Sequence, residues 1–236
     1  MWNRSELKLK AKAVLKSCYW KAVLMSVVAT IALGGMGGGG GHSDESMQSV
    51  RESFLAVPGY IWGIVLGIVG SVFIVGLLVK IFLLNPLYVG TQKFFLDSVS
   101  SEDGEPAELN VLGYAFANAY KSQVITMFLS QLFISLWTLL LIIPGIIKAY
   151  EYRMVPYILS EEPDLDYREV LEKSRKMMYG EKMNAFVLDL SFIGWHLLSA
   201  VTCGLAFLFY TGPYIQLTNA ELYMALKNKN GVYVEI

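Results

Sequence analysis

The sequence predicts an all-α fold, a polytopic helical membrane bundle of about six spans with interfacial amphipathic helices and helical hairpins broken by proline. Of the 236 residues, 55% are hydrophobic and 17% are charged, whereas soluble domains carry about 25% charged residues. The apolar residues are gathered in blocks of roughly 20, the length that a helix needs to cross a bilayer. We therefore expect one integral membrane domain over residues 1–236, with no soluble catalytic domain.

A turn signal and the placement of the cations support this class. Residues 139–148 read LLLIIPGIIK, so a Pro-Gly pair follows an apolar run and predicts a helical hairpin. Apart from groups at membrane depth, the Lys and Arg residues fall in segments that we assign to the cytosol, and only Arg51 falls in an outer segment. The positive-inside rule then predicts a multi-pass protein of the cytoplasmic membrane with both termini in the cytosol.

The N-terminal third predicts an interfacial helix, two spans and two loops. Residues 5–21 place apolar side chains on one helical face and lysines on the other, as in a basic interfacial helix. The first span follows at Ala22–Met36, and residues 37–58 form an outer glycine-rich loop that lacks the GKS/T of a phosphate-binding loop. The second span is Tyr60–Leu84.

Glycines and a proline mark the second span. Three glycines recur at near-helical spacing, which either lets two helices approach closely or reflects the frequency of glycine in spans. They are Gly63, Gly67 and Gly70. Asn85-Pro86 is expected to kink or break the helix before a cytosolic acidic loop at 97–110.

The rest of the chain predicts four more spans. These are Gln123–Ile143, a short Ile146–Leu159, Met183–Tyr210 and Tyr214–Leu226, with an amphipathic segment at Val111–Lys121 and a cytosolic basic helix at 160–182. The short span must cross, because otherwise the cations that follow it would lie outside. The chain also shows a weak internal repeat, which is either structural or accidental. Each unit consists of an interfacial helix, a long span, a proline and a second helix rich in Tyr. The prolines of the repeat are Pro86, Pro144 and Pro213.

Five charged residues lie at predicted membrane depth, where an isolated charge costs about 2.5–3.5 kcal/mol. They are Lys148, Glu151, Arg153, Asp189 and Glu221. Lys148 and Glu151 are three residues apart and can pair on one helix face. Arg153 needs a partner elsewhere, and Asp189 and Glu221 are the available acids. Two interpretations remain open: a polar network that locks the helices together, or a site for a substrate, a lipid headgroup or an ion.

The basic helices predict contact with membrane lipids, including anionic lipids. The residues expected to make it are Lys8, Lys12, Lys16, Lys173, Arg175 and Lys176. A net charge of −1 gives no basic field for nucleic acid. No GxSxG or HExxH motif and no metal-ligand spacing is present, so we expect no enzymatic activity, no metal and no cofactor.

Several motifs resemble one family over nearly the whole chain. They are LKxxAKxxLKxxYWKA at 7–22, NPLYVGxxxFF at 85–95, LLLIIPGIIKAYEYRMVPYIL at 139–159, SRKMMYGEKxxxFxLDLSFIGWxLL at 174–198 and GPYxxLTxAxLYxAL at 212–226. This set resembles the integral membrane proteins of domain of unknown function family 975, found mainly in Gram-positive bacteria. A looser likeness is to the membrane domain of some glycerophosphodiester phosphodiesterases, whose catalytic barrel is absent here. The resemblance implies a helical inner-membrane protein and brings no activity.

Two classes of function follow from these features. The first is a non-enzymatic scaffold or interaction protein of the cell envelope, for which a homo-oligomer is one arrangement. The alternative is a small transporter or lipid-handling protein whose intramembrane charges line a path, which the repeat and the proline-broken helices favour.

Overall fold

The computed structural model describes residues 2–32, 59–101 and 107–231, and the regular structure in these ranges is entirely helical. The predicted outer loop at 37–58 and residues 102–106 of the predicted acidic loop lie outside them. The helices are α1 (Arg4–Ala32), α3 (Gly59–Val79), η2 (Lys80–Leu84), α4 (Asn85–Ser100), η3 (Leu109–Gly113), α5 (Tyr114–Ala117), α6 (Tyr120–Leu140), α7 (Ile142–Glu151), α8 (Val155–Glu161), α9 (Tyr167–Met177), α10 (Lys182–Leu190), α11 (Ile193–Val201), η4 (Phe207–Thr211) and α12 (Gly212–Gly231). The segments η2 and η4 are π-helical and η3 is a 3₁₀ helix.

Four helical segments of the described ranges are long and apolar enough to cross a membrane, in agreement with the predicted class. They are Arg4–Ile31, Gly63–Ser100, Tyr120–Leu140 and Lys182–Val201. The predicted short span at Ile146–Leu159 is divided between α7 and α8, and the one at Tyr214–Leu226 lies within α12, which is outside this set. The count of six spans is therefore not established by the structure.

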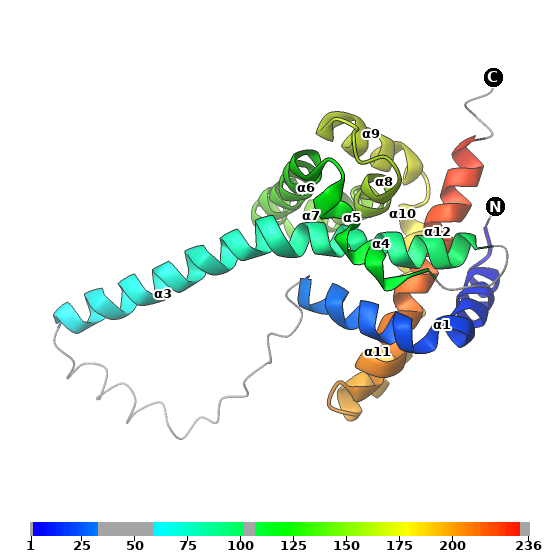
Figure 1. Ribbon diagram of the computed structural model, residues 1–236, viewed down its shortest axis with the longest axis horizontal. Helices are drawn as coiled ribbons and strands as arrows, with labels where there is room; N and C mark the ends of the chain where they lie inside the picture. Colours follow the sequence, from blue (N-terminus) through cyan, green and yellow to red (C-terminus); the bar gives the residue numbers. More distant parts are fainter. Residues whose placement is uncertain (1, 33–58, 102–106, 232–236) are drawn as a thin grey trace.

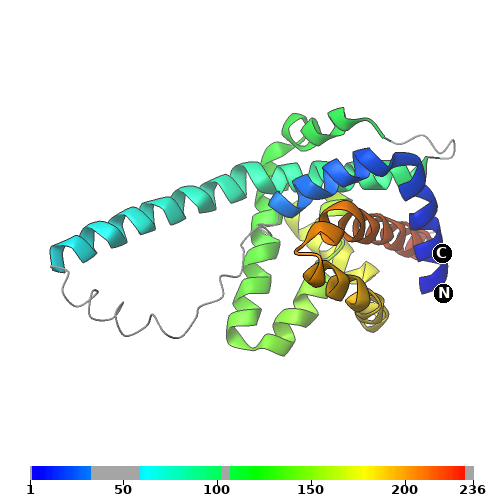
Figure 2. The same cartoon turned by 90° about the horizontal axis from the view of Figure 1, so that it is seen from below.

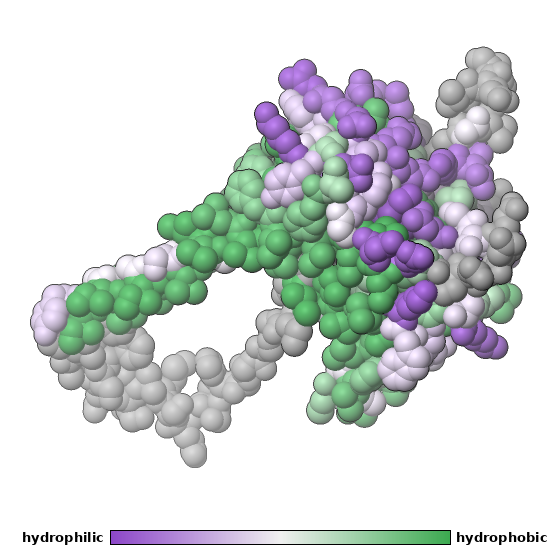
Figure 3. All heavy atoms as spheres, viewed as in Figure 1, coloured by the Kyte–Doolittle hydropathy of each residue, from purple (hydrophilic) through white to green (hydrophobic). Residues whose placement is uncertain are grey.

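A polar-surfaced body is built around α4, α8 and α12, with the first half of α1 and α9 packed onto them (Figures 1 and 2). These helices supply the fully buried aromatic and aliphatic side chains of the core. Examples are Phe94, Phe95, Ile158, Leu159, Leu222 and Tyr223. The purple surface in Figure 3 covers this body, whereas the green apolar surface covers α3 and the lower part of the molecule. Burial in protein, not in lipid, therefore explains the apolar residues of α8 and α12.

The predicted interfacial helix at 5–21 is the first half of α1, and its apolar face is covered by protein. Leu7, Ala11 and Leu15 are at most 3% exposed, because α1 packs against α12 and α4. Cys18 has non-helical angles (φ −122°, ψ 25°), so α1 bends where the predicted interfacial helix meets the predicted span. Only the basic face of this helix is left for lipid headgroups.

Of the kink or break predicted at Asn85-Pro86, the break is not found, since α3, η2 and α4 follow one another without interruption (Figure 1). Pro86 has no N–H and would leave an unmatched carbonyl in a regular helix. The π-helical turn η2 precedes it, and the N–H of Asn85 donates to the Lys80 carbonyl five residues back. Pro86 thus falls in the first turn of α4, where proline is tolerated.

The structure places a repeated proline at the start of each central helix. Pro86, Pro156 and Pro213 are each the second residue of α4, α8 and α12 respectively. A non-α segment precedes each one: η2, the turn at 152–154, and η4. Pro156 therefore takes the place that the sequence repeat gave to Pro144.

Helices α6 and α7 lie side by side as a hairpin (Figure 2). The chain reverses at Leu141, whose backbone is extended (φ −155°), three residues before Pro144. Gly145 of α7 lies so close to α6 that an added Cβ would be 2.6 Å from the Cα of Thr138. The absence of a side chain at Gly145 thus allows α6 and α7 to approach closely.

Candidate functional site

Arg153 is the centre of one group of partly buried polar side chains. It lies in the turn between α7 and α8 and binds Asp189 of α10 through two hydrogen bonds, from Nη1 (2.8 Å) and Nη2 (2.7 Å). Nη2 also donates to Asn219 of α12 (2.8 Å), and the hydroxyl of Tyr150 donates to Asp189 (2.8 Å). We call these four residues the Arg153 cluster. Asp189 and Glu221 were the two acids expected as possible partners of Arg153, and the structure shows that Asp189 is its partner.

Glu151 is the centre of a second group, which joins α7, α9 and α10. Its carboxylate accepts from Lys148 (2.6 Å) and from Lys182 (2.5 Å). The hydroxyl of Ser174 on α9 donates to the Glu151 carbonyl (2.7 Å). The side chain of Glu151 is 10% exposed, so this carboxylate is compensated by two cations where little water reaches it.

Glu221 stands apart from both groups. It is 8% exposed on α12, and within the described ranges it makes no hydrogen bond or ion pair. Burial raises the pKa of Glu221, and the neighbouring charges of Lys10 and Glu6 act on it in opposite directions. The five predicted residues therefore form two separate paired groups and one isolated acid, and not one continuous line.

A third buried carboxylate, Glu181, was not predicted. It accepts from the indole of Trp2 (3.0 Å), from Asn184 (2.8 Å) and from Lys229 of α12 (2.6 Å). We call this set the Glu181 clamp. Its signal in the sequence is an acid between a basic helix and a predicted span, directly after Gly180, whose φ of +76° turns the chain. The partners at the two ends of the chain could not be read from the sequence.

The side chains predicted to contact lipid differ in their exposure and in their hydrogen-bond and ion-pair partners. Lys8 is half-buried, donates to the Ser191 carbonyl (3.2 Å) and lies 4.1 Å from the ring centre of Phe192. Lys12 and Lys16 are exposed, although Lys12 also reaches the ring of Tyr214. Lys173 pairs with Glu162, and Lys176 pairs with Glu172 (2.9 Å). Arg175 is exposed and has no ion pair with any other residue of the described ranges.

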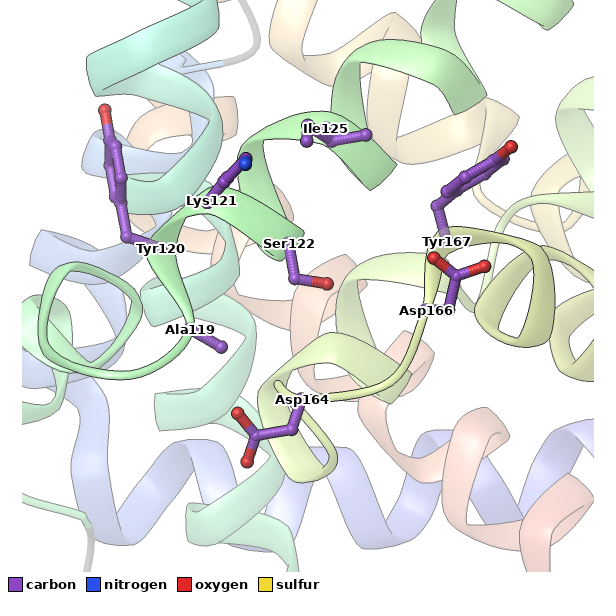
Figure 4. Close-up of a pocket in the computed structure, with 8 residues that line it drawn as sticks. All are labelled: Ala119, Tyr120, Lys121, Ser122, Ile125, Asp164, Asp166 and Tyr167. Atoms are coloured by element: carbon purple, nitrogen blue, oxygen red, sulfur yellow. The ribbon is translucent and has the colours of Figure 1, made fainter.

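A pocket of about 450 Å³ lies between the start of α6 and the loop that leads into α9 (Figure 4). Its lining includes Lys121, Ser122, Asp164 and Asp166, together with Tyr120 and Tyr167. Ser122 donates to the Leu165 carbonyl across this junction (2.8 Å). None of the predicted site residues lines this pocket.

Comparison with known proteins places the chain in a family. The sequence model of the family described as "Protein of unknown function (DUF975)" matches residues 61–230. The chain belongs to this family. No curated protein and no solved structure matches it. The family match covers the Arg153 cluster, the Glu151 group and Glu181, and the predicted family is thereby confirmed.

In this DUF975 chain the Glu181 clamp predicts a specific loss of stability in acid. Burial alone would raise the pKa of Glu181, but hydrogen bonds from Asn184, Lys229 and Trp2 outweigh it, and the pKa lies below its ordinary value of 4.5. Because the pKa is lower in the folded protein, the stabilisation is complete above the unfolded pKa and is lost as the pH falls toward the folded one.

Glu181→Gln should therefore lower the melting temperature at about pH 7 and flatten its decrease between about pH 6 and about pH 3. The measurement is thermal unfolding of the full chain in detergent at each pH. Glu169→Gln is the matched control, because Glu169 is an exposed acid on α9 without an ion pair in the described ranges. Parallel pH curves for all three proteins would contradict the prediction.

Proposed function

We propose that this chain is a non-enzymatic interaction protein of the cytoplasmic membrane, a scaffold that binds other membrane helices through α3. The observation that carries the proposal is that α3 is apolar and that, within the described chain, its only extensive contact is with the turn η2 that continues it (Figures 1 and 3). From Ile64 to Val79 its large apolar side chains are between 41% and 71% exposed, and Tyr60 at its start is 71% exposed. Every other candidate span buries part of its surface in the protein.

Three glycines give α3 a face suited to helix association. Gly63, Gly67 and Gly70 are spaced i, i+4 and i+7, so they share one side of the helix. A Cβ added at any of them would meet no described atom within 4 Å, so no contact in the described part of the chain accounts for their small size. Small residues let two backbones approach closely in lipid, and a second copy of the same helix is self-complementary. A homo-oligomer through this face is therefore the proposed assembly.

The paired charges support a structural role for the polar interior. Arg153 uses both terminal nitrogens on Asp189 and Asn219, and Glu151 is bound by Lys148 and Lys182. Groups engaged in this way hold α7, α8, α10 and α12 together, as a scaffold requires. A transport path needs groups that can exchange partners with a solute.

The proposed orientation places both termini in the cytosol. Trp2 and Lys229 bind the same carboxylate, Glu181, so the two described ends of the chain lie together (Figure 1). The body that carries them bears the basic α9, whose Lys173, Arg175 and Lys176 would face the anionic headgroups of the cytosolic leaflet.

The experiment compares glycine variants of the full-length protein in vesicles, by energy transfer between donor- and acceptor-labelled chains. Gly67→Ile should weaken association about tenfold, because a branched side chain separates the two backbones. Gly76→Ile is the matched control. It lies about two and a half turns from Gly67, on the opposite side of α3, and its Cβ would also meet nothing within 4 Å.

Both variants should melt like the unmodified protein, since neither new side chain clashes within the chain. A monomeric unmodified protein would overturn the proposal, and so would equal weakening by both variants.

The alternative, a small transporter or lipid-handling protein, is favoured by a different observation. Four buried polar atoms on α4 and α6 have no hydrogen-bond partner among the described residues, and such atoms can bind water or a polar solute. They are Asn85 Nδ2, Gln92 Oε1, Gln123 Oε1 and Thr126 Oγ1. The scaffold has the stronger support, because four of the five charged groups expected to line the path are paired with one another.

A further inference from the structure

A polar pocket and an apolar groove meet at Lys182. The pocket, of about 360 Å³, is lined by Glu151, Glu172, Arg175, Lys176, Tyr179 and Lys182. The groove, of about 220 Å³, is lined by Ile146, Ile147, Tyr150, Lys182, Met183 and Phe186. Lys182 lines both, so the two spaces adjoin at the point where α10 begins.

The groove offers an apolar surface between α7 and α10. Ile146, Ile147 and Phe186 are each between 43% and 49% exposed, and Met183 is 70% exposed. Met183 and Phe186 belong to the candidate span Lys182–Val201, which carries further exposed apolar side chains on α11. The setting of the groove is therefore the outer edge of the hydrocarbon layer.

The pocket offers positive charge beside that edge. Lys182 and Lys176 are compensated by Glu151 and Glu172, whereas Arg175 has no ion pair within the described part of the chain. Helix α10 begins at Lys182 without a side-chain cap, so the positive end of its dipole is also directed at this region. The net preference is for an anion.

Tyr179 indicates that the pocket lies at the level of the lipid headgroups. It is 83% exposed, lies in the turn after α9, and lines the basic pocket, which adjoins the apolar groove at Lys182. Tyrosine is enriched at the level of the headgroups, where its ring meets lipid and its hydroxyl meets water. The arrangement therefore runs from charged to aromatic to apolar in the same order as a phospholipid.

We propose that the pocket and groove form a discrete binding site for one phospholipid with an anionic headgroup. Arg175 and the start of α10 bind the headgroup phosphate, and one acyl chain lies along Ile147, Met183 and Phe186. The charges match this occupant, and the joined groove distinguishes it from a free phosphate, which has no chain to fill it. The site goes beyond the scaffold role and does not depend on association through α3.

The test is native mass spectrometry of the full-length protein released from detergent. The probes are dioleoyl phosphatidylglycerol, dioleoyl phosphatidylcholine and glycerol phosphate, each added separately. We expect one phosphatidylglycerol to be retained, phosphatidylcholine to bind about fivefold more weakly, and glycerol phosphate not to be retained.

Two variants address the two halves of the site, each with a matched control. Arg175→Gln should weaken phosphatidylglycerol binding about fivefold, while Lys173→Gln, two residues away and outside the pocket, should not. Ile147→Trp should fill the groove and abolish retention, while Leu197→Trp, on the exposed surface of α11 and outside the groove, should not. Circular dichroism establishes that each variant is folded, and the two halves are tested independently of each other.

Equal losses in Arg175→Gln and Lys173→Gln would overturn a discrete site and leave general attraction to anionic lipid. Retention of glycerol phosphate, or full binding by Ile147→Trp, would overturn the acyl-chain groove. Gly67→Ile should bind the lipid normally, so failure of the scaffold proposal and failure of this one are distinguishable.

Discussion

Arg153→Met should destabilise the folded protein by about 3 kcal/mol, because Asp189 would keep its charge and lose its bidentate partner. Asp189 lies within the candidate span Lys182–Val201, where hydrocarbon cannot solvate the exposed part of its carboxylate. Asn219 would lose its donor at the same time. The measurement is thermal unfolding of the full-length protein in detergent, followed by circular dichroism.

The double variant Arg153→Met with Asp189→Leu should recover most of the lost stability, because it leaves no unpaired charge. Lys227→Met is the matched control: it breaks the ion pair with Glu161 at a site where Lys227 is 47% exposed, and should cost less than about 1 kcal/mol. An unchanged melting temperature in Arg153→Met, together with loss of cellular activity, would contradict the structural role and favour the transporter.

Gly145→Ala should destabilise the protein by about 2–3 kcal/mol, although alanine is the better helix former. The new Cβ would lie 2.6 Å from the Cα of Thr138, and no side-chain rotation can relieve a contact with backbone. Helices α6 and α7 would have to separate, which exposes the packing between them. Chemical or thermal unfolding of the full chain measures the change.

Gly194→Ala provides the comparison for this prediction. Gly194 lies in α11 with nothing within 4 Å of the added Cβ, so the substitution should be neutral or should stabilise the helix by about 0.5–1 kcal/mol. Equal effects at Gly145 and Gly194 would show that the close approach of α6 and α7 contributes nothing.

The sequence was sufficient for the helical class, the membrane character and the family. Apolar blocks of span length and a specific set of motifs carry that information locally. The Lys148–Glu151 pair was also readable, because three-residue spacing fixes two side chains on one helix face. The choice between Asp189 and Glu221 as the partner of Arg153 was not, since it depends on how α10 and α12 lie against the turn after α7.

The predicted count of six spans was not established, for a physical reason. Hydropathy records that a side chain avoids water, and it does not record whether lipid or protein covers it. The apolar residues of α8 and α12 were therefore read as spans, although Ile158, Leu159 and Leu222 are buried in the core. At Asn85-Pro86 the helix does not end, because a local π-helical turn can absorb a proline.

The Glu181 clamp has a consequence for the chain as a whole. Trp2 and Lys229 both donate hydrogen bonds to the carboxylate of Glu181, so the two described ends of the chain are held together without a covalent link. Unwinding of the last turn of α12 would remove the Lys229 contact from Glu181 and weaken the site that Trp2 binds. Removal of the first residues would likewise remove the Trp2 contact and weaken the attachment of α12. New termini opened elsewhere, with a short linker joining the old ones, would preserve this closure.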